Sequence, residues 1–330
     1  SFWVDEMETV YATQQKSFGT VLYNIYTKDT AAPQYFYKDG GGAMPLNFLF
    51  SYYWTKLFGL SEFKLRLLSA LFGTASIYMI ILIGKIMFNE KVGLTSAFIT
   101  SINYTHINFS QEARTYSLIV LLTLMTIYFF INALKKNSTF YWTAYVLSSV
   151  LLIYTHYFGF FILTFEYLFL LINLKVYIKY LKSILISSAG IFILYSPWIP
   201  SLVRQISGSG YLSFYFKTDI IAWDLAKIFV QFNSWITPDL QTRVALRNVY
   251  HSIANLSVSN LFEVTFLGWV TIACVLAITA IFTYFFISII FKNKKSIDKL
   301  KDKKYLFLLM WFLMPIFFPI MITLIFPASP

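Results

Sequence analysis

The stretch from residue 113 to residue 133 reads ARTYSLIVLLTLMTIYFFINA and decides the fold class of this chain. After Arg114 it contains no charged side chain, and about 20 predominantly apolar residues are enough for a helix to cross the hydrocarbon core of a bilayer. The whole chain of 330 residues is 58% hydrophobic and only 12% charged. Soluble domains carry roughly 25% charged residues. The sequence therefore predicts an all-α, polytopic integral membrane protein.

Eight apolar segments are expected to cross the membrane, and they lie roughly at 66–84, 91–108, 113–133, 140–156, 157–174, 183–200, 263–291 and 305–326. The stretch 45–58, PLNFLFSYYWTKLF, would reach only about 21 Å as a helix, so we expect it to lie in the interface. A second interfacial helix is expected at 219–232, where apolar residues recur on one helical face. The predicted organisation is an outer loop 1–65, a transmembrane core 66–200, an outer loop 201–262 and a transmembrane pair 263–330.

Basic residues set the predicted orientation. Four short loops hold 14 basic and three acidic residues, whereas the other loops hold 12 basic and 11 acidic residues. The basic residues of the four loops include Lys85, Lys91, Lys135, Lys136, Lys175, Lys179, Lys182 and the seven lysines from Lys292 to Lys304. Lys and Arg are enriched in cytoplasmic loops. We therefore place these loops in the cytoplasm and any chemistry on the outer face of the plasma membrane. The net charge of +11 then indicates topology and does not indicate nucleic-acid binding.

Two motifs on the predicted outer face contain acids. Asp5 and Glu6 form a carboxylate pair that could act as a general base or hold a divalent cation, although most such pairs are solvated loop charges. The second motif, SQEARTY from Ser110, opens a transmembrane helix. Its Glu112 and Arg114 could anchor the helix end as a structural pair. They could equally bind a phosphate and a sugar hydroxyl.

Three further polar residues are candidates. His156 begins HYFG at an outer turn, where it could be the polar tip of an aromatic cluster or a hydrogen-bond donor to substrate; His106 is a weaker case of the same kind. Arg66 opens the first span and could face the same site or extend to lipid headgroups. Glu166 is the one acid in the interior of a predicted span, and we expect it to hydrogen-bond to a neighbouring helix rather than to carry ions.

Several kinds of chemistry lack their sequence signatures. The single cysteine, Cys274, excludes a disulfide framework and a cysteine-based metal site. The chain contains no phosphate-binding P-loop, no dinucleotide-binding glycine pattern, no zinc-protease His-Glu-x-x-His and no Gly-x-Ser-x-Gly. Nucleotide-driven chemistry is therefore not supported. A divalent cation at Asp5 is the one cofactor that we consider.

Motifs along much of the chain follow the order and spacing of one enzyme family. PLNFLFSYYWTKLFGLSEFKLRLLSALFG begins at Pro45, and GKIMFNEKVGL and SQEARTYSLIVLLTL follow it. WVDE lies upstream, and THYFGFFIL and YSPWIPSLVRQ lie downstream. Over roughly residues 1–205 the chain resembles the GT-C glycosyltransferases of the dolichyl-phosphate-mannose protein mannosyltransferase superfamily. It looks most like their bacterial and archaeal branch.

The resemblance implies an enzyme that takes a sugar from a polyprenyl-phosphate carrier at the outer membrane face. The acceptor would be a hydroxyl group of a lipid, a glycan or a protein. The family's acidic motif falls on Asp5 and Glu6, its second motif on Glu112 and Arg114, and its arginine at a helix start on Arg66. Such members begin with a transmembrane helix and continue beyond the last span seen here. We therefore expect this chain to lack its first and last helices.

The physical needs of this reaction agree with the resemblance. A sugar on a lipid phosphate is already activated, so the enzyme needs a groove for the lipid, cations for the leaving phosphate and a carboxylate to deprotonate the acceptor. Two other functions stay open, a lipid-linked oligosaccharide ligase or polymerase and a non-enzymatic transporter of lipids or polysaccharides.

Overall fold

The computed structural model describes residues 2, 6–27, 44–207, 303–308 and 310–311. Within these residues every regular element is a helix and no strand occurs, as the sequence predicts. The chain divides into two units, Ser1–Tyr215 and Phe216–Pro330, and the fold below is that of the first unit. The predicted interfacial helix at 219–232 and the predicted span at 263–291 lie outside the described residues. The predicted span at 305–326 is described only as far as residue 311, and its described residues are helical.

The helices of the first unit follow one another with short connections, except that residues 28–44 separate the second helix from the third. They are α1 Met7–Gln14, α2 Phe18–Thr27, α3 Pro45–Phe58, α4 Glu62–Met87, α5 Glu90–Ser101, α6 Tyr104–Ser110, α7 Tyr116–Lys136, α8 Thr139–Ile153, α9 Phe158–Ile172, α10 Leu174–Tyr177, α11 Leu181–Tyr195 and α12 Ile199–Ser207. Two short 3₁₀ turns, Ile178–Tyr180 and Ser196–Trp198, join α10 to α11 and α11 to α12.

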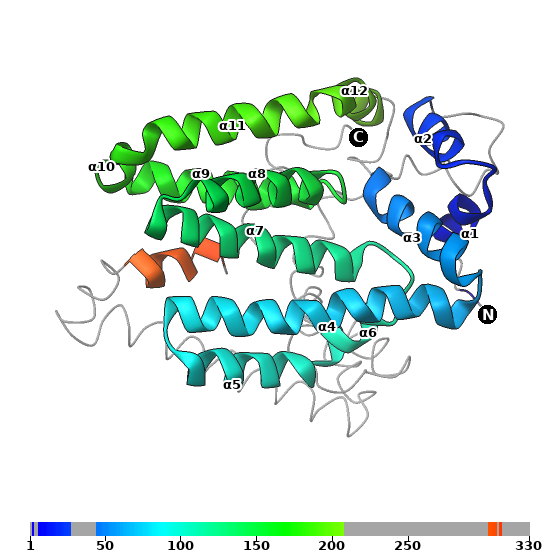
Figure 1. The fold of residues 1–330 in the computed structure, drawn as a ribbon, viewed down its shortest axis with the longest axis horizontal. Coiled ribbons are helices and arrows are strands. Elements are labelled where there is room, and N and C mark those ends of the chain that lie inside the picture. The colour runs from blue at the N-terminus through cyan, green and yellow to red at the C-terminus, as the bar shows by residue number, and fades with distance from the viewer. Residues whose placement is uncertain (1, 3–5, 28–43, 208–302, 309, 312–330) are drawn as a thin grey trace, which may run out of the picture. The chain divides into compact units, whose positions relative to one another are not determined.

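The long helices lie side by side in a layer. Figure 1 shows α5, α4, α7, α8 and α11 in this spatial order, with α9 beside α8, and with α1, α2 and α3 gathered at one end. The turns between α4 and α5 and between α7 and α8 lie at the opposite end (Figure 1). A cluster of leucines connects α3 to the layer of long helices. In it, Leu46 of α3 packs against Leu118, Leu122 and Leu152 of the layer.

Three helical segments of the described residues are long and apolar enough to span a membrane: Glu62–Met87, Tyr116–Lys136 and Leu174–Val203. Thr139–Ile153 and Phe158–Ile172 are shorter apolar helices. These five segments coincide with predicted spans, and the protein is an integral membrane protein. The total of eight crossings stays a prediction.

The predicted span at 91–108 is wrong as a single helix. The structure divides it into α5 and α6, and the side chain of Asn103 caps the second helix by accepting a hydrogen bond from the backbone N–H of His106 at 3.0 Å. Asparagine is among the preferred N-cap residues, so a new helix starts here, within the largely polar stretch from Thr100 to Asn108. The 12 residues of α5 reach only about 18 Å, well short of the roughly 30 Å hydrocarbon core.

Glycines bring α4 and α5 into close contact. A Cβ atom on Gly84 would lie 2.5 Å from the Cα atom of Gly93, and one on Gly93 would lie 2.6 Å from the carbonyl oxygen of Ile81. Neither position therefore admits a side chain without moving the backbone. Small residues at such contacts let helix backbones pack closely where lipid removes the hydrophobic driving force.

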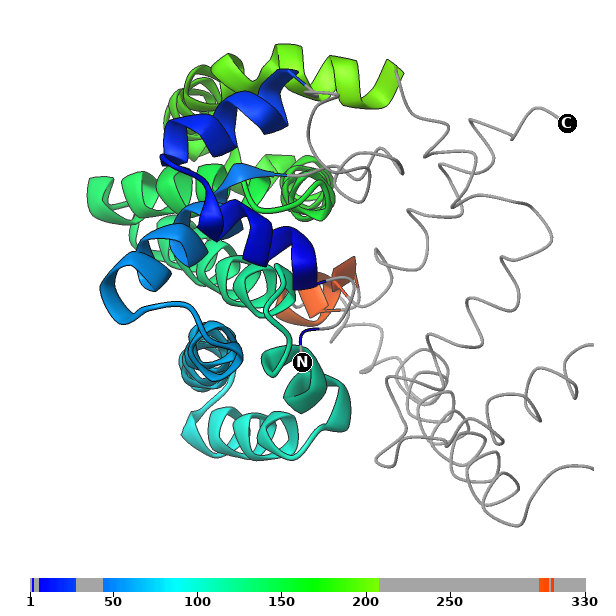
Figure 2. The same cartoon turned by 90° about the vertical axis from the view of Figure 1, so that its right-hand side faces the viewer.

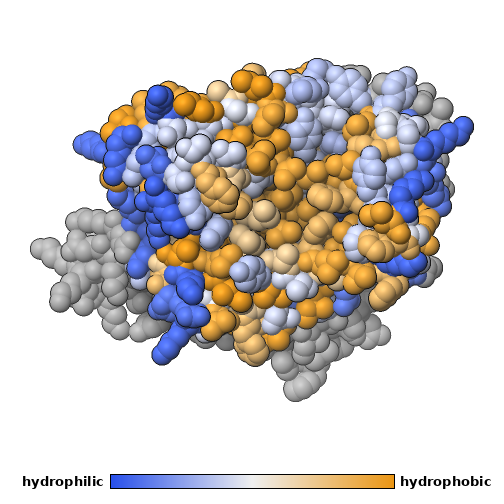
Figure 3. Space-filling view, viewed as in Figure 1, coloured by the Kyte–Doolittle hydropathy of each residue, from blue (hydrophilic) through white to orange (hydrophobic). Residues whose placement is uncertain are grey.

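The two ends of the helix layer differ in their side chains. At the end opposite α1–α3, Lys135 donates a hydrogen bond to the carbonyl oxygen of Ile86, and Lys85 lies 3.9 Å from Glu90. Figure 3 shows hydrophobic side chains across the middle of the layer and hydrophilic side chains at both ends. This distribution fits a bilayer around the middle, with the lysine-bearing turns on one side of it.

Two predictions about single elements can be compared with the structure. Residues 45–58 form a helix, α3, as predicted, and its buried face includes Leu46, Phe48 and Tyr52. Its location in the membrane interface stays a prediction. The expected hydrogen bond of Glu166 is confirmed. Glu166 of α9 is fully buried and accepts a hydrogen bond from the Tyr145 hydroxyl of the neighbouring helix α8 at 2.9 Å.

Candidate functional site

Glu6 stands at the centre of the site. It directly precedes α1, and its side chain is only 1% exposed. Arg66 near the start of α4 donates from Nε to Oε1 of Glu6 at 3.0 Å and from Nη2 to Oε2 at 2.7 Å. A third nitrogen of Arg66 bonds to Glu62, one helical turn earlier. The acid of the first motif and the arginine of the first span are therefore a bidentate ion pair.

The same carboxylate holds the second motif. The backbone N–H of Ala113 donates to Oε1 of Glu6 at 2.8 Å, and the hydroxyl of Thr9 donates to the carbonyl oxygen of Ala113 at 2.8 Å. Val10 and Leu65 cover Ala113 with apolar side chains. Both backbone polar groups of Ala113 are thus paired with the beginning of α1. The loop between α6 and α7 is held at this end of the molecule.

Glu112 is oriented from α6. The Nδ2 atom of Asn108 donates to Oε1 of Glu112 at 3.0 Å, and the hydroxyl of Tyr104 donates to Oδ1 of the same Asn108 at 3.1 Å. Tyr104 and Asn108 are four residues apart and lie on one face of α6, and Glu112 follows two residues after this helix ends. The carboxylate of Glu112 also lies close enough to interact electrostatically with Arg66.

Arg114 lies between an aromatic ring and a histidine. Its guanidinium carbon is 4.7 Å from the ring centroid of Tyr116, a distance typical of a cation–π contact. Its positive charge also acts on His156, in the turn between α8 and α9. The second motif and HYFG therefore meet in space, although 42 positions separate these two residues in the sequence.

His156 is a neutral hydrogen-bond donor at physiological pH. Burial, with the charge of Arg114 as the smaller cause, lowers the pKa of His156 from 6.5 to about 4. Its Nδ1 atom accepts a hydrogen bond from the backbone N–H of Phe158 at 3.2 Å. In a neutral imidazole only one nitrogen carries a proton, so this bond assigns the proton to Nε2.

The structure thus gathers five of the six predicted site residues at one end of the helix layer, namely Glu6, Arg66, Glu112, Arg114 and His156. Figure 2 looks onto this end, with α1, α2 and α3 lying across the ends of the long helices. The sixth, Asp5, lies outside the described residues. The ring of His106, on α6, lies within hydrogen-bonding distance of the Gly73 carbonyl oxygen at 3.2 Å.

Sequence reasoning missed the residues that hold the candidates in place. Thr9 and Asn108 carry no charge and match no catalytic pattern. The contact of Ala113 uses only its backbone, which no sequence motif reveals. The spacing of Asn108 four residues before Glu112 was the one available signal. Among the described residues, no three His, Cys, Asp or Glu side chains gather as a metal site.

Comparisons with known proteins bear on the same region. Residues 43–200 match the family described as dolichyl-phosphate-mannose-protein mannosyltransferase. No significant match was found among curated proteins or among solved structures. The matched stretch contains Arg66, the second motif and His156, and it ends within the helices described above. Over residues 43–200, just under half of its length, the chain is therefore similar to the dolichyl-phosphate-mannose-protein mannosyltransferase family of membrane glycosyltransferases.

Proposed function

We propose that this protein transfers a sugar from a polyprenyl-phosphate carrier to an acceptor hydroxyl at the outer face of the plasma membrane. One observation carries the proposal: Glu6 of the first motif bonds to both Arg66 and the backbone of Ala113 in the second motif. The two acidic motifs of the sequence are thus parts of one site. This site lies at the end of the helix layer opposite the lysine-bearing turns, which we place in the cytoplasm.

In this proposal the two acids, Asp5 and Glu6, have different roles. Glu6 is buried, and its two oxygens accept three hydrogen bonds, so it serves as a positioning residue that holds Arg66 and the Ala113 loop. Asp5 is the proposed general base. Adjacent side chains point apart in most backbone conformations, so the anchoring of Glu6 leaves Asp5 to face the acceptor.

Arg114 and His156 are the proposed phosphate ligands. A guanidinium can bind a phosphate through two parallel N–H donors, and the Nε2–H group of His156 adds a neutral donor. Glu112, oriented by Asn108, is placed to accept a hydrogen bond from a sugar hydroxyl. Arg66 contributes to this site by fixing Glu6, and its charge also faces Glu112.

The proposed reaction needs no nucleotide. The acceptor oxygen forms a bond to the anomeric carbon of the sugar while its proton passes to Asp5. The bond between the anomeric carbon and the phosphate oxygen breaks, and the electron pair leaves with the polyprenyl phosphate. Arg114 stabilises the negative charge that develops on this leaving group, which is the usual role of a preorganised cation.

Transfer from a radiolabelled polyprenyl-phosphate sugar by the purified protein in liposomes tests the function. Asp5→Asn should lower turnover by about 10²–10⁴-fold, the usual contribution of a general base, and should leave donor affinity nearly unchanged. Glu8→Gln, which removes an acid two residues after Glu6, is the matched control and should act like wild type. Normal turnover of Asp5→Asn would remove this residue from the mechanism. Movement of the intact donor across the bilayer without sugar transfer would favour the transporter function.

Orientation can be tested separately at the two ends of α7. Gln111, shortly before α7, and Lys136, its last residue, are both exposed. The 21 residues of α7 reach about 31 Å. In a Cys274→Ser background, a cysteine at 111 should react with an impermeant reagent added outside the cell. A cysteine at 136 should react only after the membrane is opened. The reverse pattern would refute the outer location of the site.

A further inference from the structure

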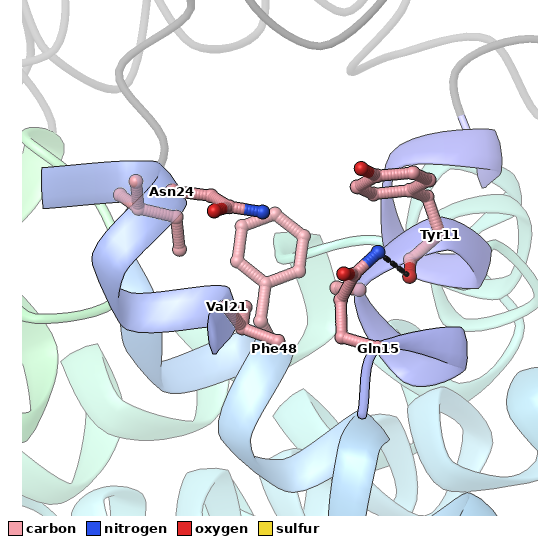
Figure 4. A pocket seen from close by; sticks show the side chains of 7 residues that line it. Tyr11, Gln15, Val21, Asn24 and Phe48 are labelled. Carbon is pink, nitrogen blue, oxygen red and sulfur yellow. Dashed lines mark hydrogen bonds between the residues drawn. The ribbon is translucent and has the colours of Figure 1, made fainter. Parts of the chain in front are cut away.

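A small space lies between α1, α2 and α3. Figure 4 shows Tyr11 and Gln15 on one side of it, and Asn24 and Phe48 on the other. It has room for about one water molecule, so it admits no substrate group. Unpaired polar atoms lie instead in the interior of the helix layer, between α7, α8 and α9.

The side chains that α7, α8 and α9 share are arranged in layers. The layer nearer the proposed active site is aliphatic and contains one residue from each helix, namely Leu122, Leu152 and Ile162. The layer further from the active site is aromatic. In it the ring centroid of Phe130 lies 5.4 Å from that of Tyr145 and 6.5 Å from that of Phe169. These helices lie side by side in Figure 1.

A polar layer lies between the aliphatic and the aromatic layer. Thr126 of α7, Ser149 of α8 and Glu166 of α9 each lie three or four residues from the aliphatic residue and from the aromatic residue of the same helix. Residues at this spacing lie on one helix face, about one turn apart. The three polar residues therefore share one level of the interior, where all three are fully buried.

Each residue of the polar layer has an oxygen atom without a partner. Within the described residues, Thr126 Oγ1, Ser149 Oγ and Glu166 Oε1 form no hydrogen bond with one another or with any other group. Only the second oxygen of Glu166 is paired, with the Tyr145 hydroxyl. No basic side chain of the described residues forms an ion pair with Glu166. Buried polar atoms are nearly always bonded and buried charges nearly always paired, because the loss of water is costly.

One bound group can satisfy all three oxygens. A proton on Glu166 would neutralise the carboxylate but would leave the two hydroxyl oxygens without a partner. A water molecule would pair the oxygens but would leave the negative charge. A monovalent cation does both, because hard cations prefer oxygen ligands. A divalent cation would leave a net positive charge in the apolar interior.

We propose that the polar layer binds a sodium ion, with Thr126, Ser149 and Glu166 as its ligands. Three protein oxygens are few for a large cation, so sodium suits the layer better than potassium. The aliphatic and aromatic layers close the site on both sides. The ion is therefore held within the bundle and is not carried across it.

The bound ion joins three helices that also carry side chains of the proposed active site. Helix α7 begins two residues after Arg114, and α8 and α9 flank the turn that contains His156. The ion contributes to the stability of this arrangement, because a ligand that binds only the folded state stabilises it. This inference does not depend on the proposed sugar transfer.

Binding of sodium to the full-length protein in detergent tests the proposal without any turnover. The protein is purified in choline chloride, and radioactive sodium chloride is then added. We expect saturable binding of sodium. Replacing choline by sodium at equal ionic strength should also raise the melting temperature by about 2–4 °C. Absence of saturable binding, or equal melting temperatures in the two salts, would overturn the proposal, and neither measurement needs a variant.

Variants locate the ion. Glu166→Gln keeps the shape of the side chain and removes its charge, so it should raise the Kd of sodium by about tenfold or more. Thr126→Val and Ser149→Ala each remove one ligand and should also weaken binding. Ser148→Ala is the matched control, because this neighbouring hydroxyl is also buried but donates to the Tyr145 carbonyl oxygen at 3.1 Å. Equal losses of binding in Ser148→Ala and Ser149→Ala would contradict the assignment.

Infrared spectroscopy separates a cation from a proton at Glu166, since an ionised and a protonated carboxyl group absorb at different frequencies. The difference between the spectra of the protein and of Glu166→Gln isolates the signal of this side chain. In saturating sodium we expect the signal of an ionised carboxylate. The signal of a protonated carboxyl group under the same conditions would show that a proton neutralises Glu166 and would overturn the proposal.

Discussion

The exchange Glu6→Gln is the most informative perturbation of the site, because it keeps the shape of the side chain and removes its charge. From the described residues, Glu6 accepts two hydrogen bonds from Arg66 and one from the Ala113 backbone. An amide can accept from only one of its two ends, so at least one of these bonds becomes a contact between two donors. Arg66 also loses its buried counter-charge.

The expected cost follows from the burial of the two partners. Breaking a fully buried ion pair costs about 3–5 kcal/mol, whereas an exposed pair contributes only about 0–1 kcal/mol. The Glu6 side chain is 1% exposed, but that of Arg66 is 27% exposed and keeps Glu62 as a second partner. We therefore expect Glu6→Gln to lose roughly 2–3 kcal/mol, between these limits.

Thermal unfolding of the purified protein in detergent measures this loss. Glu62→Gln is the matched control, because Glu62 bonds to the same Arg66 from a side chain that is 36% exposed. This i, i+4 pair should contribute only about 0.2–0.5 kcal/mol. The double variant Glu6→Gln with Arg66→Gln should regain part of the loss, since it leaves no unpaired buried charge.

Equal melting temperatures of Glu6→Gln and Glu62→Gln would refute the anchoring role. Additive losses in the double variant would refute the coupling between Glu6 and Arg66. Either result would make Glu6 a candidate general base again.

Three further perturbations test other contacts. Arg114→Lys should weaken binding of the polyprenyl-phosphate sugar by about tenfold in calorimetry, because an ammonium cannot reproduce the bidentate guanidinium contact; equal affinity would contradict the phosphate assignment. The pKa of folded His156 is near 4, below the 6.5 of an unfolded histidine, so the unfolded chain binds more protons between these values. The stability contributed by His156 should therefore be complete above pH 6.5 and be lost toward pH 4; His156→Gln should lack this loss, and a pKa of 6.5 measured by NMR would contradict it. Gly84→Leu should lower stability by about 1–3 kcal/mol through overpacking against Gly93, whereas Gly19→Leu, at an exposed position, should cost much less; equal effects would argue against the close helix contact.

Much of the helical layer could be predicted because its signal is local. The apolar run 113–133 became α7, Tyr116–Lys136, within three residues at each end. A helix of that composition must bury its backbone polar groups in its own hydrogen bonds when lipid surrounds it, so length and hydropathy suffice. The break at Asn103 was missed although its signal is also local, because this capping asparagine lies in a largely polar stretch from Thr100 to Asn108.

The sequence also indicated which residues matter without indicating what they contact. It pointed to Glu6 as a catalytic candidate and to Arg66 as a phosphate ligand. The structure pairs them with each other across 60 positions, and it pairs Glu6 with the Ala113 backbone across 107 positions. Charge and motif position are visible in a sequence, but the partner of a buried charge is not.

By itself, therefore, the sequence determined the all-helical membrane class and the resemblance to one glycosyltransferase family, because hydropathy and motif spacing are properties of the chain alone. Only the tertiary structure decided that Glu6 bonds to both Arg66 and the Ala113 backbone, and that His156 is neutral beside Arg114. The physical reason is that burial and hydrogen-bond partners arise where distant segments pack together. A polar side chain takes its role from those surroundings and not from its neighbours in the sequence.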